Sequence, residues 1–126
     1  MSSMNEDWEN IVAVARHEVS ATIKSLPSPL RICAEDLPVC CEHRPDDGMT
    51  EDGVEGDTLG LFVGSEYSDG EFETPPAQII LFLDNIMEAV AGDEAEFRRE
   101  VRVTLMHELG HYLGLTEDAL EARGIA

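Results

Sequence analysis

Basic residues are scarce in this sequence. Eight Lys and Arg residues, only one of them lysine, stand against 27 Asp and Glu residues, and the formal net charge is −19. A chain with this charge repels the phosphates of nucleic acids and of anionic membrane surfaces. We therefore expect neither a nucleic acid nor a membrane as a partner, and a surface that consists largely of solvated acids.

Long apolar runs are absent as well. No stretch approaches the ~18 residues that a membrane-spanning helix requires. The first ten residues are polar and acidic, which is unlike a secretory signal peptide. We therefore expect a cytoplasmic protein.

Cysteine is limited to Cys33, Cys40 and Cys41. An odd number of cysteines without a secretion signal argues against a disulfide framework. The segment Cys40-Cys41-Glu42-His43 offers metal-binding side chains, but its spacing matches no common structural zinc pattern. We expect free thiols that are buried or half-buried.

The length and composition of the sequence suit a single α+β domain. The 126 residues, of which 43% are hydrophobic, are enough for a single core. We expect one domain over 1–126, with residues 1–6 flexible and an acidic, glycine-rich loop at 42–57. Apolar residues recur at helical spacing over 7–25, up to Pro27 and Pro29.

The remaining pattern predicts a small mixed sheet of about three to four strands between the N-terminal helix and a C-terminal active-site helix. Strands are expected at 30–37, 59–64 and 77–83, a short helix at 84–90, and a long helix from 93 to 113. The apolar run 77–83 is typical of a buried central strand. Leu59 to Val63 is the candidate edge strand, beside which an extended substrate would lie.

The segment His107-Glu108-Leu109-Gly110-His111 carries the chemistry. Histidines four residues apart lie about 40° apart around a helix axis and one turn displaced, so both imidazoles can converge on one ion. The HExxH pattern binds Zn²⁺ in this way. Glu108 lies near the same face, where a carboxylate takes the proton of a water that the zinc activates. The pattern predicts metal-assisted hydrolysis, most naturally of a peptide bond.

The same helix divides into two faces. One is an apolar stripe about 140° wide that we expect to face the core, formed by Val101, Leu105, Met106, Leu109, Tyr112 and Leu113. A separate arc of about 100° holds the polar groups of the site, namely Thr104, His107, Glu108 and His111. The packing residues and the chemical residues therefore point in different directions.

A zinc site of this type needs a third protein ligand. Fifteen residues follow His111, so the candidates are Glu117, Asp118 and Glu121, or a residue upstream. Gly114 favours the first of these, because glycine ends a helix in the left-handed conformation and turns the following residues back toward the ion. HExxHxxGxxH enzymes have a His ligand at the position of Glu117. A carboxylate serves equally, so Glu117 is the first choice and Asp118 the second.

The motif, the order of elements and the segments LGLFVGSEY, QIILFLDNI and HELGHYLGLTEDAL resemble the minimal zincin family of small bacterial metallopeptidase-like proteins. The resemblance covers most of the chain and is weakest over 37–58. It implies a zincin half-domain, with a short sheet, a packing helix and the active-site helix. The family pattern HExxHxxGxx(D/E) maps onto His107, His111 and Glu117 as zinc ligands and onto Glu108 as general base.

Other polar residues are candidates for stabilising the oxyanion or for binding substrate. Peptide hydrolysis needs a donor for the developing oxyanion, and Tyr67, Tyr112, His43 and Arg102 are available, although Tyr112 falls on the packing stripe. His43 is also a candidate for binding substrate. His17 lies on the polar side of the first helix, where we expect a surface residue.

Two functional hypotheses follow. The first is a cytoplasmic zinc-dependent metallopeptidase that acts on a peptide or protein substrate. The second is a non-catalytic zinc-binding or partner-binding protein on a zincin scaffold.

Overall fold

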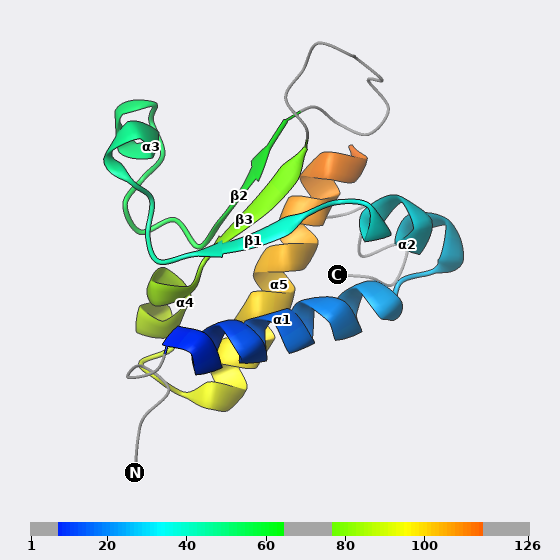
Figure 1. Cartoon of the computed structure of the whole chain (residues 1–126), viewed down its shortest axis with the longest axis horizontal. Helices are drawn as coiled ribbons and strands as arrows, with labels where there is room; N and C mark the ends of the chain where they lie inside the picture. Colours follow the sequence, from blue (N-terminus) through cyan, green and yellow to red (C-terminus); the bar gives the residue numbers. More distant parts are fainter. Residues whose placement is uncertain (1–7, 65–76, 115–126) are drawn as a thin grey trace.

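A computed structural model describes residues 8–64 and 77–114, and the helices and strands below lie within these ranges (Figure 1). The elements are, in order, α1 (Trp8–Lys24), α2 (Ser28–Glu35), β1 (Val39–Glu42), α3 (Asp47–Glu51), β2 (Gly60–Val63), β3 (Gln78–Phe82), α4 (Leu83–Ala89) and α5 (Glu94–Leu113). The predicted α+β class is confirmed. In this part of the chain, no helix is long and apolar enough to cross a membrane.

The strands form a mixed sheet with β3 at its centre. Its order is β1-β3-β2. β1 runs parallel to β3, with Val39 opposite Ile79, and β2 runs antiparallel to it, with Gly60 opposite Leu81. The apolar run that predicted a central strand is indeed β3, and four of its five residues are buried. The candidate edge strand is β2.

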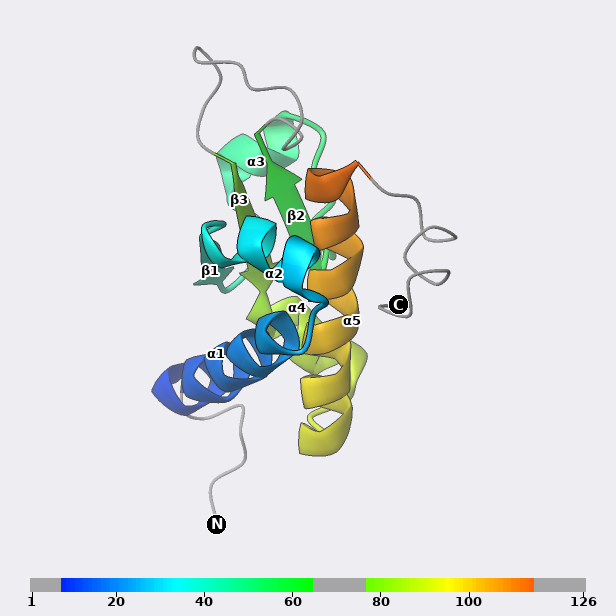
Figure 2. The ribbon, with the colours of Figure 1, turned by 90° about the vertical axis from the view of Figure 1, so that its right-hand side faces the viewer.

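α5 is the main packing partner of the sheet. It contacts β2 and β3, and α1 packs against α5 in turn. Figure 2 shows α5 running beside the sheet, with α1 crossing near the N-terminal half of α5. The largest fully buried side chains come from β3, α4 and α5, and include Ile79, Leu81, Phe82, Leu83, Ile86, Phe97, Val101, Leu105 and Leu109. The core therefore lies between the inner face of the sheet and α5.

The strand predicted at 30–37 is wrong, because this segment is helical. α2 begins after Pro27 and has Pro29 in its first turn. Proline at the start of a helix loses no hydrogen bond, and its fixed φ suits the helical conformation. The two prolines that end α1 therefore also start α2. Ile32, the β-branched residue that suggested a strand, is 60% exposed.

The acidic segment 42–57 is more ordered than the predicted loop. β1 supplies its first residue, and α3 forms one short helix within it. Asp46 caps α3, since its side chain accepts a hydrogen bond of 2.8 Å from the backbone N–H of Met49. An acid at this position satisfies a backbone donor that the helix leaves without a partner. The position of Asp46 in this segment is therefore explained by local structure.

Asn85 ties the end of this segment to the core. The side chain is buried, and its Nδ2 donates to the backbone oxygens of Gly56 (2.8 Å) and Thr58 (2.9 Å). Its Oδ1 accepts from the guanidinium of Arg44. The side-chain amide of Asn85, on α4, thus holds the residues that lead into β2.

Replacing Asn85 with Ala is expected to lower the free energy of unfolding by about 2–4 kcal/mol, because the change leaves two carbonyl groups and a guanidinium without their partner. Urea denaturation measures the difference. Glu88→Gln is the matched control on α4, since Glu88 forms only an exposed ion pair with Arg44 and its loss costs about 0–1 kcal/mol. Equal stabilities of the two variants would contradict the role of Asn85.

Candidate metal centre

α5 begins and ends where its local signals predict. The side chain of Asp93 accepts from the backbone N–H of Glu96 at 2.9 Å and caps the first turn. At the other end, Gly114 has φ 70° and its N–H donates to the oxygens of Gly110 and His111. This left-handed backbone conformation is unfavourable for residues other than glycine. The left-handed helix end predicted at Gly114 is therefore confirmed, while the residues expected to turn back toward the ion lie outside the described part of the chain.

The predicted packing face of α5 is buried, except that Leu113 at its C-terminal end is half-buried. Val101, Leu105 and Leu109 are almost fully inaccessible. Tyr112 is also buried, and its ring lies 5.7 Å from that of Phe62 on β2, centroid to centroid. This contact places Tyr112 in the core, as its position on the apolar stripe predicts.

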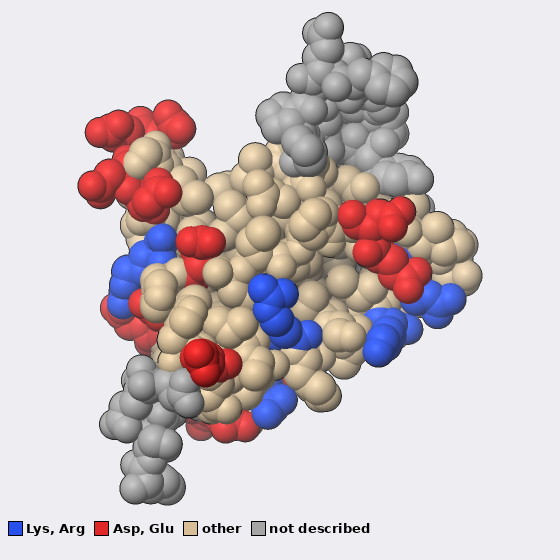
Figure 3. Space-filling model, viewed as in Figure 1, with Lys and Arg blue, Asp and Glu red and all other residues tan. Residues whose placement is uncertain are grey.

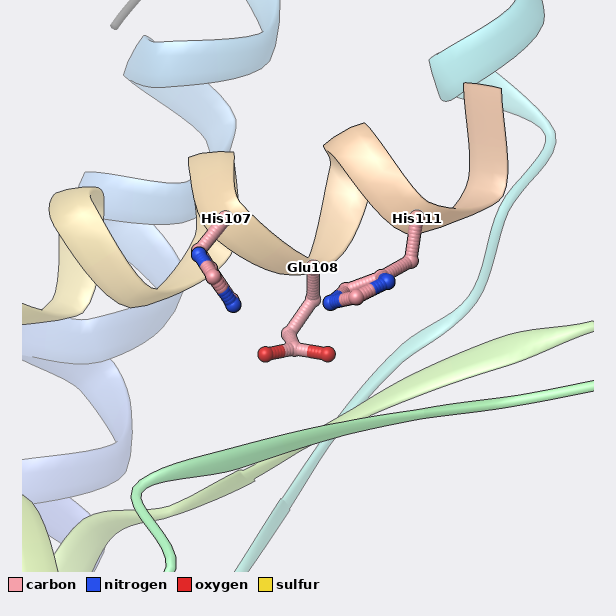
Figure 4. A group of neighbouring side chains, drawn as sticks. All are labelled: His107, Glu108 and His111. Atoms are coloured by element: carbon pink, nitrogen blue, oxygen red, sulfur yellow. The ribbon is translucent and has the colours of Figure 1, made fainter. Parts of the chain in front are cut away.

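The polar face of α5 brings His107, Glu108 and His111 together (Figure 4). One ligand atom from each residue lies within 4.8 Å of the other two. The two imidazole rings are exposed, with centroids 5.0 Å apart and an interplanar angle of 77°. Figure 4 shows both imidazoles and the carboxylate on the side of α5 that faces the strands. In the described part of the chain, this is the only such group of metal-binding side chains.

Glu108 differs from the histidines in its surroundings, because it is only 9% exposed. β2 passes close to it. A Cβ built on Gly60 would lie 3.5 Å from the Cγ of Glu108 and 2.5 Å from the Cγ2 of Thr104, one helical turn earlier. Only a residue without a side chain allows β2 this approach. The carboxylate thus lies between the helix and the edge strand, and its burial lowers the local dielectric around it.

The side chains fit Zn²⁺. The two imidazoles are nitrogen donors that zinc takes in proteins, and the carboxylate of Glu108 lies beside them. Glu117 and Asp118, the candidates for the third ligand, lie outside the described residues.

The other candidates are placed elsewhere. His43 stacks on Trp8, with ring centroids 3.7 Å apart, and its Nδ1 lies 3.1 Å from a carboxylate oxygen of Asp84. Arg102 pairs with Glu18 on α1. His43 and Arg102 are thus engaged with α1 and α4, away from the polar face of α5.

Two smaller predictions concern His17 and the cysteines. His17 is exposed on α1. The cysteines are free and half-buried, as predicted. Cys40 donates a 3.3 Å hydrogen bond to the side-chain oxygen of Gln78. Tyr67 lies outside the described residues.

A family model for zincin-like metallopeptidases matches residues 34–125, which include the whole sheet and α5. The chain belongs to the zincin-like metallopeptidase family. This zincin-like protein has no match among curated proteins. Membership implies a zinc-binding scaffold, and the cluster on α5 is the group of described residues that could hold the ion.

The close approach of β2 to α5 can be tested by adding one methyl group. Gly60→Ala is expected to destabilise the protein by about 1–3 kcal/mol, because the new Cβ overlaps the Cγ2 of Thr104. Adding Thr104→Ser, which removes that methyl group and keeps the hydroxyl, should restore most of the loss. Thermal and urea denaturation of the single and double variants measure both effects.

Gly56→Ala is the control for this experiment, since a Cβ there meets nothing within 4 Å. If Thr104→Ser fails to rescue Gly60→Ala, the contact between the strand and the helix is not the cause of the loss.

Proposed function

We propose that this zincin-like protein is a zinc-dependent peptidase, in which His107, His111 and Glu117 hold Zn²⁺ and Glu108 is the general base. The single observation that carries the proposal is the placement of a buried carboxylate between two exposed histidines on one face of α5. A purely structural zinc site uses all its positions for protein ligands. Here Glu108 follows His107 directly and is better placed as a base than as a ligand.

The chemistry divides between the ion and the chain. When bound, zinc supplies a Lewis acid that lowers the pKa of a water to roughly 7 and polarises a carbonyl. Glu108 accepts the proton of the attacking water and later delivers it to the leaving amine. Its position against β2 excludes bulk water from one side of the carboxylate, so it acts in a partly apolar environment.

The substrate is proposed to lie along β2. This strand has one neighbour, β3, among the described strands, so its other edge offers backbone donors and acceptors. An extended peptide can pair with such an edge. Because Gly60 of β2 lies against Glu108, a peptide on this edge would pass beside the two histidines.

The alternative function is a zinc-binding scaffold without turnover, and one observation favours it. Of the candidate oxyanion donors, Tyr112 is in the core, Arg102 pairs with Glu18, and His43 pairs with Asp84. A peptidase on this fold would then rely on zinc for the oxyanion, together with Tyr67 if that residue reaches the site. Turnover measurements separate the two functions.

Glu108→Gln is expected to keep zinc and lose activity. The amide preserves the size of the side chain but cannot accept a proton, so turnover should fall by about 10²–10⁴-fold. Zinc content is measured by elemental analysis, and cleavage by mass spectrometry of a proteome-derived peptide library.

Glu100→Gln is the matched control on the same helix and should behave as wild type. Equal cleavage by wild type and Glu108→Gln would rule out the proposed base. A complete lack of cleavage by the zinc-loaded wild type would instead favour the non-catalytic scaffold.

The third ligand is tested by comparing two adjacent acids. Glu117→Ala is expected to weaken zinc binding by at least about 10-fold, because a three-ligand site loses one ligand. Asp118→Ala should leave it nearly unchanged. Competition against a chromophoric chelator measures both affinities, and the opposite order would assign Asp118 as the ligand.

A further inference from the structure

A groove lies between α1 and the edge strand β1, with no residue of the metal cluster in its walls. This α1–β1 groove has a volume of about 240 Å³. Its principal lining residues are Arg16, Val19, Ser20 and Ile23 from α1 and Val39 and Cys41 from β1. The groove is at the opposite edge of the sheet from β2. Its helical wall, α1, precedes the residues that match the family.

The walls of the groove are apolar and incompletely covered. Val19 and Ile23 lie one turn apart on α1, and Val39 and Cys41 alternate on β1. All four pack against the core yet remain half-buried. Small-molecule pockets usually measure about 300–1,000 Å³. The smaller groove therefore suits one additional apolar side chain better than a whole cofactor.

The outer edge of β1, beside the groove, carries backbone groups that pair with no other described strand. In a parallel pair, peptide groups of alternate residues point to the neighbouring strand. The N–H of Ile79 donates to the oxygen of Pro38, and Val39 is opposite Ile79. The peptide groups of Val39 and Cys41 consequently point away from β3. Among the described strands β1 has no second neighbour, so these groups are available to an added strand.

Arg16 supplies an uncompensated positive charge at this groove. It is exposed and forms no ion pair with a described residue, whereas Arg44 and Arg98 each pair with acids. Its charge acts on the Cys41 thiol, but burial outweighs this effect and raises the pKa of Cys41. The thiol thus stays neutral and does not balance the guanidinium. Figure 3, viewed from this face, shows basic groups along the region of α1 and a dense group of acids at α3.

We propose that the α1–β1 groove binds a short extended peptide segment, which adds to β1 as a further strand, places one apolar side chain between Val19 and Val39, and sets a carboxylate on Arg16. The backbone edge, the apolar space and the charge are three separate features that one such ligand satisfies together. A second copy of this chain fits less well, because each copy carries a net charge of −19. A short peptide carries little charge, so the net charge of the protein repels it only weakly. Charges farther away than about 8 Å are largely screened at physiological salt, and the nearby guanidinium of Arg16 therefore dominates the electrostatic interaction with the peptide.

The test uses the full chain and a fluorescein-labelled probe peptide of sequence Thr-Val-Leu-Val-Glu, followed by fluorescence anisotropy. We expect saturable binding that weakens by about 10-fold when the Glu of the probe is replaced by Gln, a typical loss for a hydrogen bond between charged groups. Arg16→Gln should weaken binding of the Glu probe by a similar factor and remove the difference between the two probes. Arg31→Gln is the matched control, because Arg31 also lacks an ion pair with a described residue but is on α2.

A second variant and a chemical readout locate the probe. Ser20→Phe fills the groove from an exposed position on α1 and should abolish binding. Alkylation of each thiol by iodoacetamide, followed by mass spectrometry, should slow at Cys41 when the probe is bound. Cys33 on α2 is the internal control and should react at an unchanged rate.

The proposal is independent of the metal centre, so Glu108→Gln and zinc chelation should leave probe affinity unchanged. Loss of binding under either condition would move the probe to the metal centre and overturn the proposal. It would be overturned equally by a lack of saturable binding, by equal affinities of Arg16→Gln and Arg31→Gln, or by unchanged alkylation of Cys41 at saturation. A dimer of the chain that Ser20→Phe dissociates would assign the groove to a second copy instead.

Discussion

The contact between β2 and α5 is the constraint on which the rest of the site depends. Gly60 brings the strand backbone against Thr104, one helical turn before Glu108. Because of this approach, the carboxylate of Glu108 is nearly buried while both histidines stay exposed. One small residue thus sets the environment of Glu108, the proposed base.

The polar face of α5 could be predicted because its signals are local. The cap at Asp93, the left-handed Gly114 and the four-residue spacing of the histidines all act within one or two helical turns. The closeness of Gly60 to Thr104 was not predictable, since it joins residues far apart in the sequence and depends on how the sheet packs. Gly60, unlike Gly56, lies in a predicted strand, where a glycine allows a close backbone approach, but the sequence does not identify Thr104 as the residue that it approaches.

Residues 30–37, which were predicted as a strand but lie largely in α2, show a different limit of prediction from the sequence. Pro27 and Pro29 are correct stop signals for α1, but a proline in the first turn is equally a start signal. The choice depends on what the next residues pack against, and α2 buries only Ala34. The strand expected there occurs a few residues later, as β1, where Val39 and Cys41 alternate toward α1. Tertiary packing therefore decides which of the two segments pairs with β3.

The position of β3 has a consequence for the order of assembly. Within the described residues, both outer strands pair only with β3, so a nascent chain that has not yet extended to Gln78 lacks the partner of both strands. Such non-local pairing is slow, because the intervening loops must close before any backbone bond forms. α5 follows all three strands in the sequence. A zinc ion held by the histidines of α5 would therefore bind only after the strands are synthesised, and it would stabilise the folded domain by mass action.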